Sequence, residues 1–193
     1  MSVVIIYHSG YGHTKKLAEA VFQGVQAVNE MAILIAIDAE GNIPAEAWET
    51  LAKADTIIFG SPTYMGSVSW QFKKFADASS KAWLAQTWKD KLAAGFTNSA
   101  SMNGDKLSTI HYLITLAMQH AMLWASSGFM PASTKAATRN DINYLGCFAG
   151  LISQSPSDAS PEEGPLPGDL ETAKLFGKRI AELTLARQTT KLT

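Results

Sequence analysis

Residues 3–21 read VVIIYHSGYGHTKKLAEAV, in which an apolar run leads through a polar turn into a segment with helical apolar spacing. The run predicts a strand, and the spacing after His13 predicts a helix that opens directly from the turn. The first N–H groups of a helix have no intrahelical partner, and the positive end of its dipole points into such a turn. Ser9 and Thr14 add hydroxyl donors at the same place. The stretch therefore predicts a phosphate-binding turn between a strand and a helix.

Two common nucleotide motifs do not fit this turn. A P-loop closes with a Lys-Ser or Lys-Thr pair, and none stands here. A dinucleotide fingerprint needs a third glycine after Gly10 and Gly12, but Lys15 holds that position and would crowd the helix against the strand. A single terminal phosphate fits better, as in the FMN sites of flavodoxin-like folds. The residues that would hold it are Ser9, Gly10, Tyr11, Gly12, His13 and Thr14. An ordinary turn with a Ser or Thr helix cap explains the same residues, so the turn by itself leaves both interpretations open.

The composition is that of a globular protein. A chain of 193 residues suits one compact α/β domain over residues 1–193, large enough to bury a sheet between helices. Hydrophobic residues make up 47% of the chain and charged residues 17%. The net charge of −1 lacks the basic excess of a nucleic-acid-binding protein, so no nucleic-acid partner is expected. This near-neutral net charge is also unlike that of a strongly acidic electron carrier, which docks to basic partners.

Cysteine usage and hydropathy bear on location and metal binding. Cys147 is the single cysteine and can form no internal disulfide, which suits a reducing compartment. The chain enters its first strand without a secretory leader, and no apolar stretch approaches the roughly 18 residues that a membrane helix needs. We therefore expect a cytoplasmic protein without membrane insertion. His111 and His120 lack a metal-ligand spacing and no Cys/His cluster is present, so no metal site is expected.

Strand and helix patterns alternate along the chain, which predicts a doubly wound parallel sheet with helices on both faces. The expected strands are Val3–His8, Met31–Ile37, Asp55–Gly60, Leu92–Thr97 and a fifth after Ala121–Ala125. The expected helices are His13–Val28, Pro44–Lys53, Val68–Ser80, Asp105–His120 and Asp169–Ala186. Residues 126–143 would interrupt the fifth strand region, and residues 153–168 would form a surface loop. We expect the flavodoxin-like strand order 2-1-3-4-5 for this five-stranded sheet.

In that order the first, third and fourth strands are neighbours, so the polar loops after them meet at one edge of the sheet. The second of these loops would flank a ring system with Pro62, Thr63, Tyr64, Met65 and Gly66. The third would contribute Asn98, Ser99, Ala100, Ser101, Asn103 and Gly104. Plain packing is the alternative for Tyr64 and Met65, but their place at this edge favours ligand contact. Neither loop contains Asp or Glu, which favours stabilising a negative charge on a ligand.

Several motifs together resemble a known family. Residues 9–13 read SGYGH and residues 59–66 read FGSPTYMG. Further matching residues are Gln71, Lys73, Phe75, Asp77, Trp83 and His120. On these residues the chain resembles the flavodoxin-like quinone reductases called tryptophan-repressor-binding-protein-like NAD(P)H:quinone oxidoreductases. The resemblance runs nearly end to end, and its most specific part is the Gly-x-Pro-Thr-x-x-Gly element.

The resemblance implies non-covalent FMN as cofactor and NAD(P)H as co-substrate in the two-electron, ping-pong reduction of quinones. Residues 9–14 would hold the FMN phosphate, and residues 62–66 and 98–104 would flank the isoalloxazine. Tyr11 and Trp83 would border the nicotinamide or quinone site, and His120 would reach its edge, including from across a subunit boundary. The flavin would do the redox chemistry, so no catalytic side chain is expected.

The chain departs from the family pattern at two loops. The third loop reads Asn-Ser-Ala-Ser-Met-Asn-Gly in place of a Thr/Gly-rich run, and Asp38–Pro44 is short where the family has a long insertion that contributes to tetramer contacts. We therefore expect a homodimer at least as readily as a homotetramer. The alternatives to a quinone reductase are a flavodoxin-type electron-transfer protein, an FMN reductase, and an interaction protein whose flavin pocket is vestigial.

Overall fold

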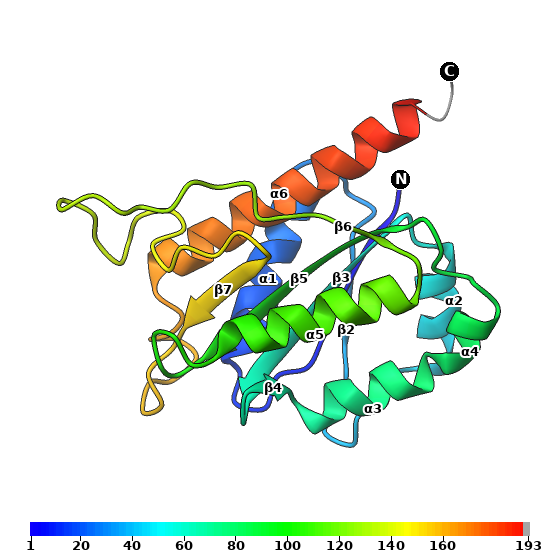
Figure 1. The fold of residues 1–193 in the computed structure, drawn as a ribbon, viewed down its shortest axis with the longest axis horizontal. Helices are drawn as coiled ribbons and strands as arrows, with labels where there is room; N and C mark the ends of the chain where they lie inside the picture. Colours follow the sequence, from blue (N-terminus) through cyan, green and yellow to red (C-terminus); the bar gives the residue numbers. More distant parts are fainter. Residues whose placement is uncertain (191–193) are drawn as a thin grey trace.

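A parallel sheet lies at the centre of the molecule, with helices on both of its faces (Figure 1). The structure, a computed structural model, describes residues 1–190. The strands are β1 (Val3–Tyr7), β2 (Ile33–Ala36), β3 (Thr56–Tyr64), β4 (Ser67–Val68), β5 (Leu92–Ser99), β6 (Leu123–Trp124) and β7 (Leu151–Gln154). The main path is β2-β1-β3-β5-β6, and every pair along it is parallel. The predicted order 2-1-3-4-5 is confirmed, with β6 in the fifth position.

The fifth position of the sheet is divided between two short strands. β6 pairs with Leu92 and Ala93 at the start of β5, whereas β7 pairs with residues 96–99 at its end. The chain leaves the sheet between them over residues 125–150. The predicted interruption of the fifth strand is therefore confirmed. The expected surface loop over residues 153–168 is shorter than predicted, because Ser153 and Gln154 complete β7.

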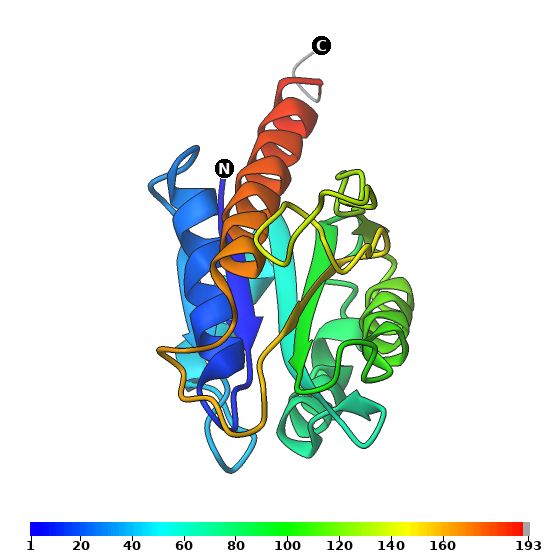
Figure 2. The ribbon, with the colours of Figure 1, turned by 90° about the vertical axis from the view of Figure 1, so that its left-hand side faces the viewer.

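The two faces of the sheet are covered by different helices. The helices are α1 (His13–Gln26), α2 (Ala45–Lys53), α3 (Trp70–Ala78), α4 (Ser80–Leu84), α5 (Lys106–Gln119) and α6 (Pro167–Thr190). Figure 2 shows α1 and α6 side by side on one face and α5 on the other. Successive strand residues point to opposite faces, so Val3 and Ile5 pack under α1 and α6 while Val4 and Ile6 join the other core. Burial on both faces explains why β1 is a continuous apolar run.

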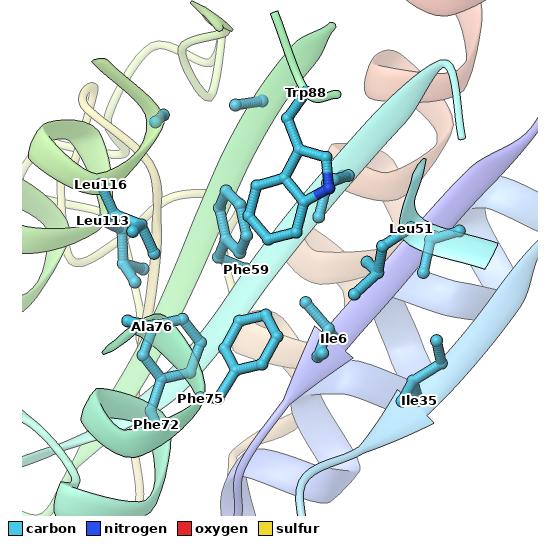
Figure 3. Packing of buried hydrophobic residues seen from close by; sticks show 14 of the residues in the cluster. Ile6, Ile35, Leu51, Phe59, Phe72, Phe75, Ala76, Trp88, Leu113 and Leu116 are labelled. Carbon is cyan, nitrogen blue, oxygen red and sulfur yellow. The ribbon is translucent and has the colours of Figure 1, made fainter. Parts of the chain in front are cut away.

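Aromatic rings fill the core on the α2–α3–α5 face (Figure 3). Phe59, Phe72, Phe75 and Trp88 are all buried there. The Phe72 and Phe75 ring centroids are 5.6 Å apart, and those of Phe59 and Trp88 are 6.1 Å apart. Burying such a side chain stabilises the fold by about 1.5–3 kcal/mol. This packing fixes α3, and with it the chain that leaves the end of β3.

The helices α1 and α6 approach closely where two glycines face the opposite backbone. A Cβ atom built on Gly24 would lie 1.9 Å from the carbonyl oxygen of Lys174, and one on Gly177 would lie 2.0 Å from that of Val21. Only residues without a side chain fit at these positions. The crossing holds the second half of α1 against the first half of α6.

The third strand is longer than predicted. The expected strand ended at Gly60, but β3 runs on to Tyr64 because β5 pairs beside Ser61 and Pro62. Residues predicted to lie in a turn, including Thr63, therefore lie on a strand. The apolar pattern could not show this, because the extension is polar and is held by its neighbours.

Past Tyr64 the chain folds back as a hairpin. β4 pairs antiparallel with Thr63 and Tyr64. The turn residues Met65 and Gly66 have φ values of 47° and 76°, which are the positive values of the two-residue turn that suits twisted hairpins.

Among residues 1–190, none of the helices has the length and apolar character needed to cross a bilayer.

Candidate functional site

A cavity of about 570 Å³ opens at the carboxyl ends of β1, β3 and β5. Ligands of open parallel sheets bind at this edge, where the strand order reverses. The volume lies in the range of small-molecule sites. Within residues 1–190, the lining contains no Asp, Glu, Lys or Arg. It consists of Tyr11, His13, Thr14, Pro62, Thr63, Tyr64, Asn98, Ser99, Ala100, Ser155, Pro156, Ser157 and Ala159.

The hydroxyl of Ser9 holds the turn after β1 in shape. Its Oγ accepts hydrogen bonds from the N–H groups of Gly12 and Lys15, both at 3.1 Å. Gly12 has a φ of 91°, which glycine adopts without strain. The first two residues of α1, His13 and Thr14, line the cavity, so the amino terminus of the helix opens onto it. Ser9 and the two glycines thus shape the predicted turn without lining the cavity themselves.

A buried hydroxyl cluster supports the middle of the cavity. The Oγ1 atom of Thr63 lies 2.8 Å from the Oγ1 atoms of both Thr97 and Thr109. A hydroxyl donates one hydrogen and accepts two, so a chain of three can satisfy itself. The cluster joins β3, β5 and α5 and fixes Thr63 against the cavity.

Two tyrosines form an aromatic rim. The rings of Tyr11 and Tyr64 meet edge to face, with centroids 6.1 Å apart, and Tyr11 is 77% exposed. A Cβ atom on Gly10 would lie 2.5 Å from the Tyr64 hydroxyl, so this ring packs directly on the turn. Burial, with a smaller effect from Tyr11, raises the pKa of Tyr64, which keeps its hydroxyl protonated at neutral pH.

The third predicted loop is divided between the cavity and the turn that follows. Asn98, Ser99 and Ala100 line the cavity, and the Oδ1 atom of Asn98 accepts hydrogen bonds from the hydroxyls of Ser153 and Ser155. Ser101, Asn103 and Gly104 are not among the lining residues. They belong to the turn before α5.

The segment between β7 and α6 closes the cavity, which the sequence reasoning missed. Ser155, Pro156, Ser157 and Ala159 line it, and His13 Nε2 lies 2.9 Å from the carbonyl oxygen of Ala159. The run of serines and prolines predicted only a surface loop. Its hydroxyls directly after the fifth strand were the available signal, because that strand ends at the same edge of the sheet.

Comparison with known proteins identifies the family. Residues 1–136 match the family described as NADPH-dependent FMN reductase. The chain belongs to this family. It is 53% identical over 180 residues to flavodoxin FldP of Pseudomonas aeruginosa (strain UCBPP-PA14), covering 93% of this chain and 95% of that protein. It is 32% identical over 210 residues to an NAD(P)H dehydrogenase (quinone) of Geotalea uraniireducens (strain Rf4), covering 95% and 97% respectively.

Solved structures agree with this assignment. The flavodoxin, WrbA-like protein from Agrobacterium tumefaciens is 48% identical, with a TM-score of 0.77, and the match covers 96% of this chain and 98% of that chain. The predicted resemblance to the flavodoxin-like quinone reductases is confirmed at the level of family and fold. As a member of the FMN reductase family, the chain is a flavin-binding oxidoreductase.

The residues of the cavity fit FMN. Hydroxyls of Thr14 and Ser157, together with the first amides of α1, form a donor set suited to a phosphate. The Tyr64 ring and Pro62 offer flat apolar surface near the strand ends. No carboxylate in the described lining opposes an anionic ligand. The FMN reductase family assignment and the local chemistry therefore agree.

Trp83 and His120 lie around a different cavity, of about 270 Å³, formed with α3 and α5. The two linings share no residue. The ring of His120 is buried, with Nε2 2.9 Å from the Ser79 hydroxyl, and burial lowers its pKa to about 4. The structure therefore does not bring Trp83 or His120 to Tyr11 within one chain. Their role at the substrate site stays a prediction that requires a partner subunit.

The hairpin tip and two charged residues also fall outside the cavity. Met65 is fully exposed at the tip, and a Cβ atom on Gly66 would meet nothing within 4 Å. The guanidinium of Arg139 pairs with the buried Asp169 carboxylate at 3.0 Å, so it is held in the fold. Within residues 1–190, no group of His, Cys, Asp and Glu is arranged to hold a metal ion.

Proposed function

We propose that this chain is an FMN-dependent NAD(P)H:quinone oxidoreductase that passes two electrons from a nicotinamide nucleotide to a quinone. The observation that carries the proposal is the uncharged cavity at the strand ends, open beside an aromatic rim. FMN supplies, when bound, the redox chemistry of both half-reactions. The relative named NAD(P)H dehydrogenase (quinone), 32% identical over nearly the whole chain, supports this assignment.

In this proposal the residues of the cavity bind and orient the cofactor. The amino terminus of α1 and the hydroxyl of Thr14 hold the phosphate through N–H and O–H donors and the helix dipole. Residues 62–64 lie on β3 and residues 98–99 on the adjacent strand β5, with Ala100 directly after it, so the strands hold the ring end rigidly. Because no carboxylate lines the described cavity, a negative charge on the reduced cofactor meets no repulsion there.

The substrate side of the proposal rests on Tyr11. Its ring is exposed at the rim and meets Tyr64 edge to face, which leaves one flat aromatic face for a nicotinamide or a quinone. One such face would serve the two substrates in turn, as a ping-pong scheme requires. No side chain of the cavity needs to act as nucleophile or base.

A flavodoxin-type electron-transfer protein is the second candidate, because a relative at 53% identity bears the name flavodoxin. An activity assay on purified protein loaded with FMN distinguishes the quinone oxidoreductase from the electron-transfer protein. We expect oxidation of NADH or NADPH with menadione or benzoquinone when no other protein is present. Turnover only after a separate reductase is added would support the electron carrier and overturn our proposal. Protein that ignores added FMN would leave the interaction protein as the remaining candidate.

A pair of glycine variants tests the phosphate turn. Gly12→Ala strains a residue with a φ of 91° and places a Cβ atom 2.6 Å from Pro161 Cγ, so we expect FMN to dissociate about tenfold more readily. Gly66→Ala is the matched control, because its φ of 76° is similar but its Cβ atom meets nothing. Fluorescence titration with FMN measures both. Equal affinity of the two variants would place the phosphate elsewhere.

A further inference from the structure

Lys106, the first residue of α5, is buried although it carries a charge. It is 1% exposed, and none of the ion pairs in the described part of the chain includes it. Its Nζ donates instead to three successive carbonyl oxygens, those of Ser101, Met102 and Asn103, at 2.5, 3.2 and 3.4 Å. An ammonium has three donors, so the turn takes up all of them.

These bonds set the direction of the peptide groups in the turn. The C=O of one residue and the N–H of the next point in opposite directions across a planar trans peptide. With the carbonyls of residues 101–103 turned to Lys106, the N–H groups of Met102, Asn103 and Gly104 face away from it. Gly104 has a φ of 55°, and a Cβ atom there would lie 2.2 Å from Ser99 Oγ, so the turn closes tightly around the ammonium.

The turn continues directly from the cavity lining. Ser99 and Ala100 line the cavity, and the carbonyl oxygen of Ala100 accepts a hydrogen bond of 2.7 Å from the Gln154 side chain. Lys106 therefore anchors one end of a loop whose other end forms the wall of the flavin site. The resemblance to quinone reductases gives no role to a lysine at this place.

Burial of Lys106 acts against its charged form. Burial lowers the pKa of Lys106 to about 8, although the Asp169 carboxylate acts in the opposite direction and Arg139 adds to the lowering. Because the unfolded chain binds the proton more tightly than the folded chain, the ammonium form at pH 7 costs folding free energy. Charged groups kept at such a cost beside a ligand cavity are commonly functional.

We propose that Lys106 is a positioning residue of the flavin site, whose ammonium gathers the carbonyl oxygens of residues 101–103 and thereby fixes Ser99 and Ala100, which lead into this turn, in the wall of the cavity. The inference rests on the proposed function only in that FMN occupies the cavity. It does not depend on whether the electrons go to a quinone or to a partner protein.

The test compares Lys106→Met with Lys174→Met. Lys174 is an exposed lysine of α6 that pairs with Glu171. Charge-assisted hydrogen bonds are lost in the first variant alone, so we expect FMN to bind it at least tenfold more weakly. The urea midpoint of the cofactor-free protein should change little, because the carbonyls of this exposed turn can accept hydrogen bonds from water instead. Amide hydrogen exchange at residues 102–104 of that protein should become faster. The control variant should change none of these, and Lys106→Arg should recover part of the affinity.

The outcomes separate the two proposals. Wild-type affinity for FMN in Lys106→Met would overturn the role of Lys106 and leave the proposed function intact. A fall in affinity matched by a fall in the urea midpoint, with Lys106→Arg giving no recovery, would show a structural role only. Wild-type protein that binds no FMN would overturn both proposals.

Discussion

His120 is packed against Trp88, with ring centroids 4.2 Å apart, and its Nδ1 has no hydrogen-bond partner among residues 1–190. Burial lowers its pKa from 6.5 to about 4, so it stays neutral in the folded protein while the unfolded chain takes up a proton below pH 6.5. The contribution of neutral His120 to the free energy of unfolding is complete above pH 6.5 and is lost as the pH falls toward 4. At pH 5 the loss should reach about 2 kcal/mol.

The exposed His111 offers a matched control for this prediction. Urea unfolding at pH 7 and pH 5 would be compared in wild type, His120→Asn and His111→Asn. Between pH 7 and pH 5, the free energy of unfolding should fall by about 2 kcal/mol more in wild type and in His111→Asn than in His120→Asn. Burial also lowers the pKa of His8, but His8 is present in all three proteins. An identical pH effect in the three would contradict the buried, neutral state of His120.

At the scale of elements, the crossing of α1 and α6 depends on the absence of two side chains. Gly24→Ala places a methyl group 1.9 Å from the Lys174 carbonyl oxygen, so the helices must separate. We expect a loss of about 1–3 kcal/mol from this overpacking, although alanine favours an isolated helix by about 1 kcal/mol. Urea unfolding measures it, with the exposed Gln23→Ala on the same helix as control. A Gly24→Ala protein as stable as the control would show that the two helices can part without loss.

The segment over residues 125–150 is tied to the site through α6 and β7. Asp169 at the start of α6 accepts hydrogen bonds from the Arg139 guanidinium and from the backbone N–H of Gln154, at 3.0 and 2.9 Å. The Gln154 side chain in turn holds Ala100 at the cavity. One buried carboxylate thus connects the interrupting segment, the last strand and the third loop. Specificity carried by this segment would act on the site through these bonds.

At the scale of the whole molecule, the position of Trp83 bears on the oligomeric state that the proposed activity requires. Trp83 and the cavity that it lines are separate from the cavity at the strand ends within one chain. We predict a homodimer or homotetramer in which Trp83 reaches the site of a partner subunit. Trp83→Ala should then raise the KM for the quinone several-fold and leave FMN affinity unchanged. Leu84→Ala, on the same short helix and 79% exposed, is the control.

Light scattering after gel filtration, with steady-state kinetics, checks this prediction. A monomer whose kinetics do not respond to Trp83→Ala would remove both Trp83 and His120 from the substrate site. An oligomer with unchanged kinetics would keep the assembly but remove Trp83 from catalysis. The cytoplasmic location stays a prediction, since it is not a property of the fold.

Local pattern was enough to predict the central sheet. β1 and α1 could be placed from residues 3–21, because burial on both faces makes a strand continuously apolar and a 3.6-residue period marks a helix. The turn at Ser9 could also be predicted, because it is built from neighbours in sequence. The strand order was expected from the flavodoxin-like arrangement, which is one of the two common orders of doubly wound sheets.

Segments far apart in the chain decided the rest. Pro62 and Thr63 lie on a strand because β5 pairs beside one and β4 beside the other, and Ser155 reaches the cavity because β7 ends at the same edge. Lys106 is buried because a turn closes over it, which no spacing in the sequence indicates. The period of apolar side chains depends on a few consecutive residues, so it can be recognised in the sequence. Burial and pairing of polar segments depend on distant partners, so only the tertiary structure determined them.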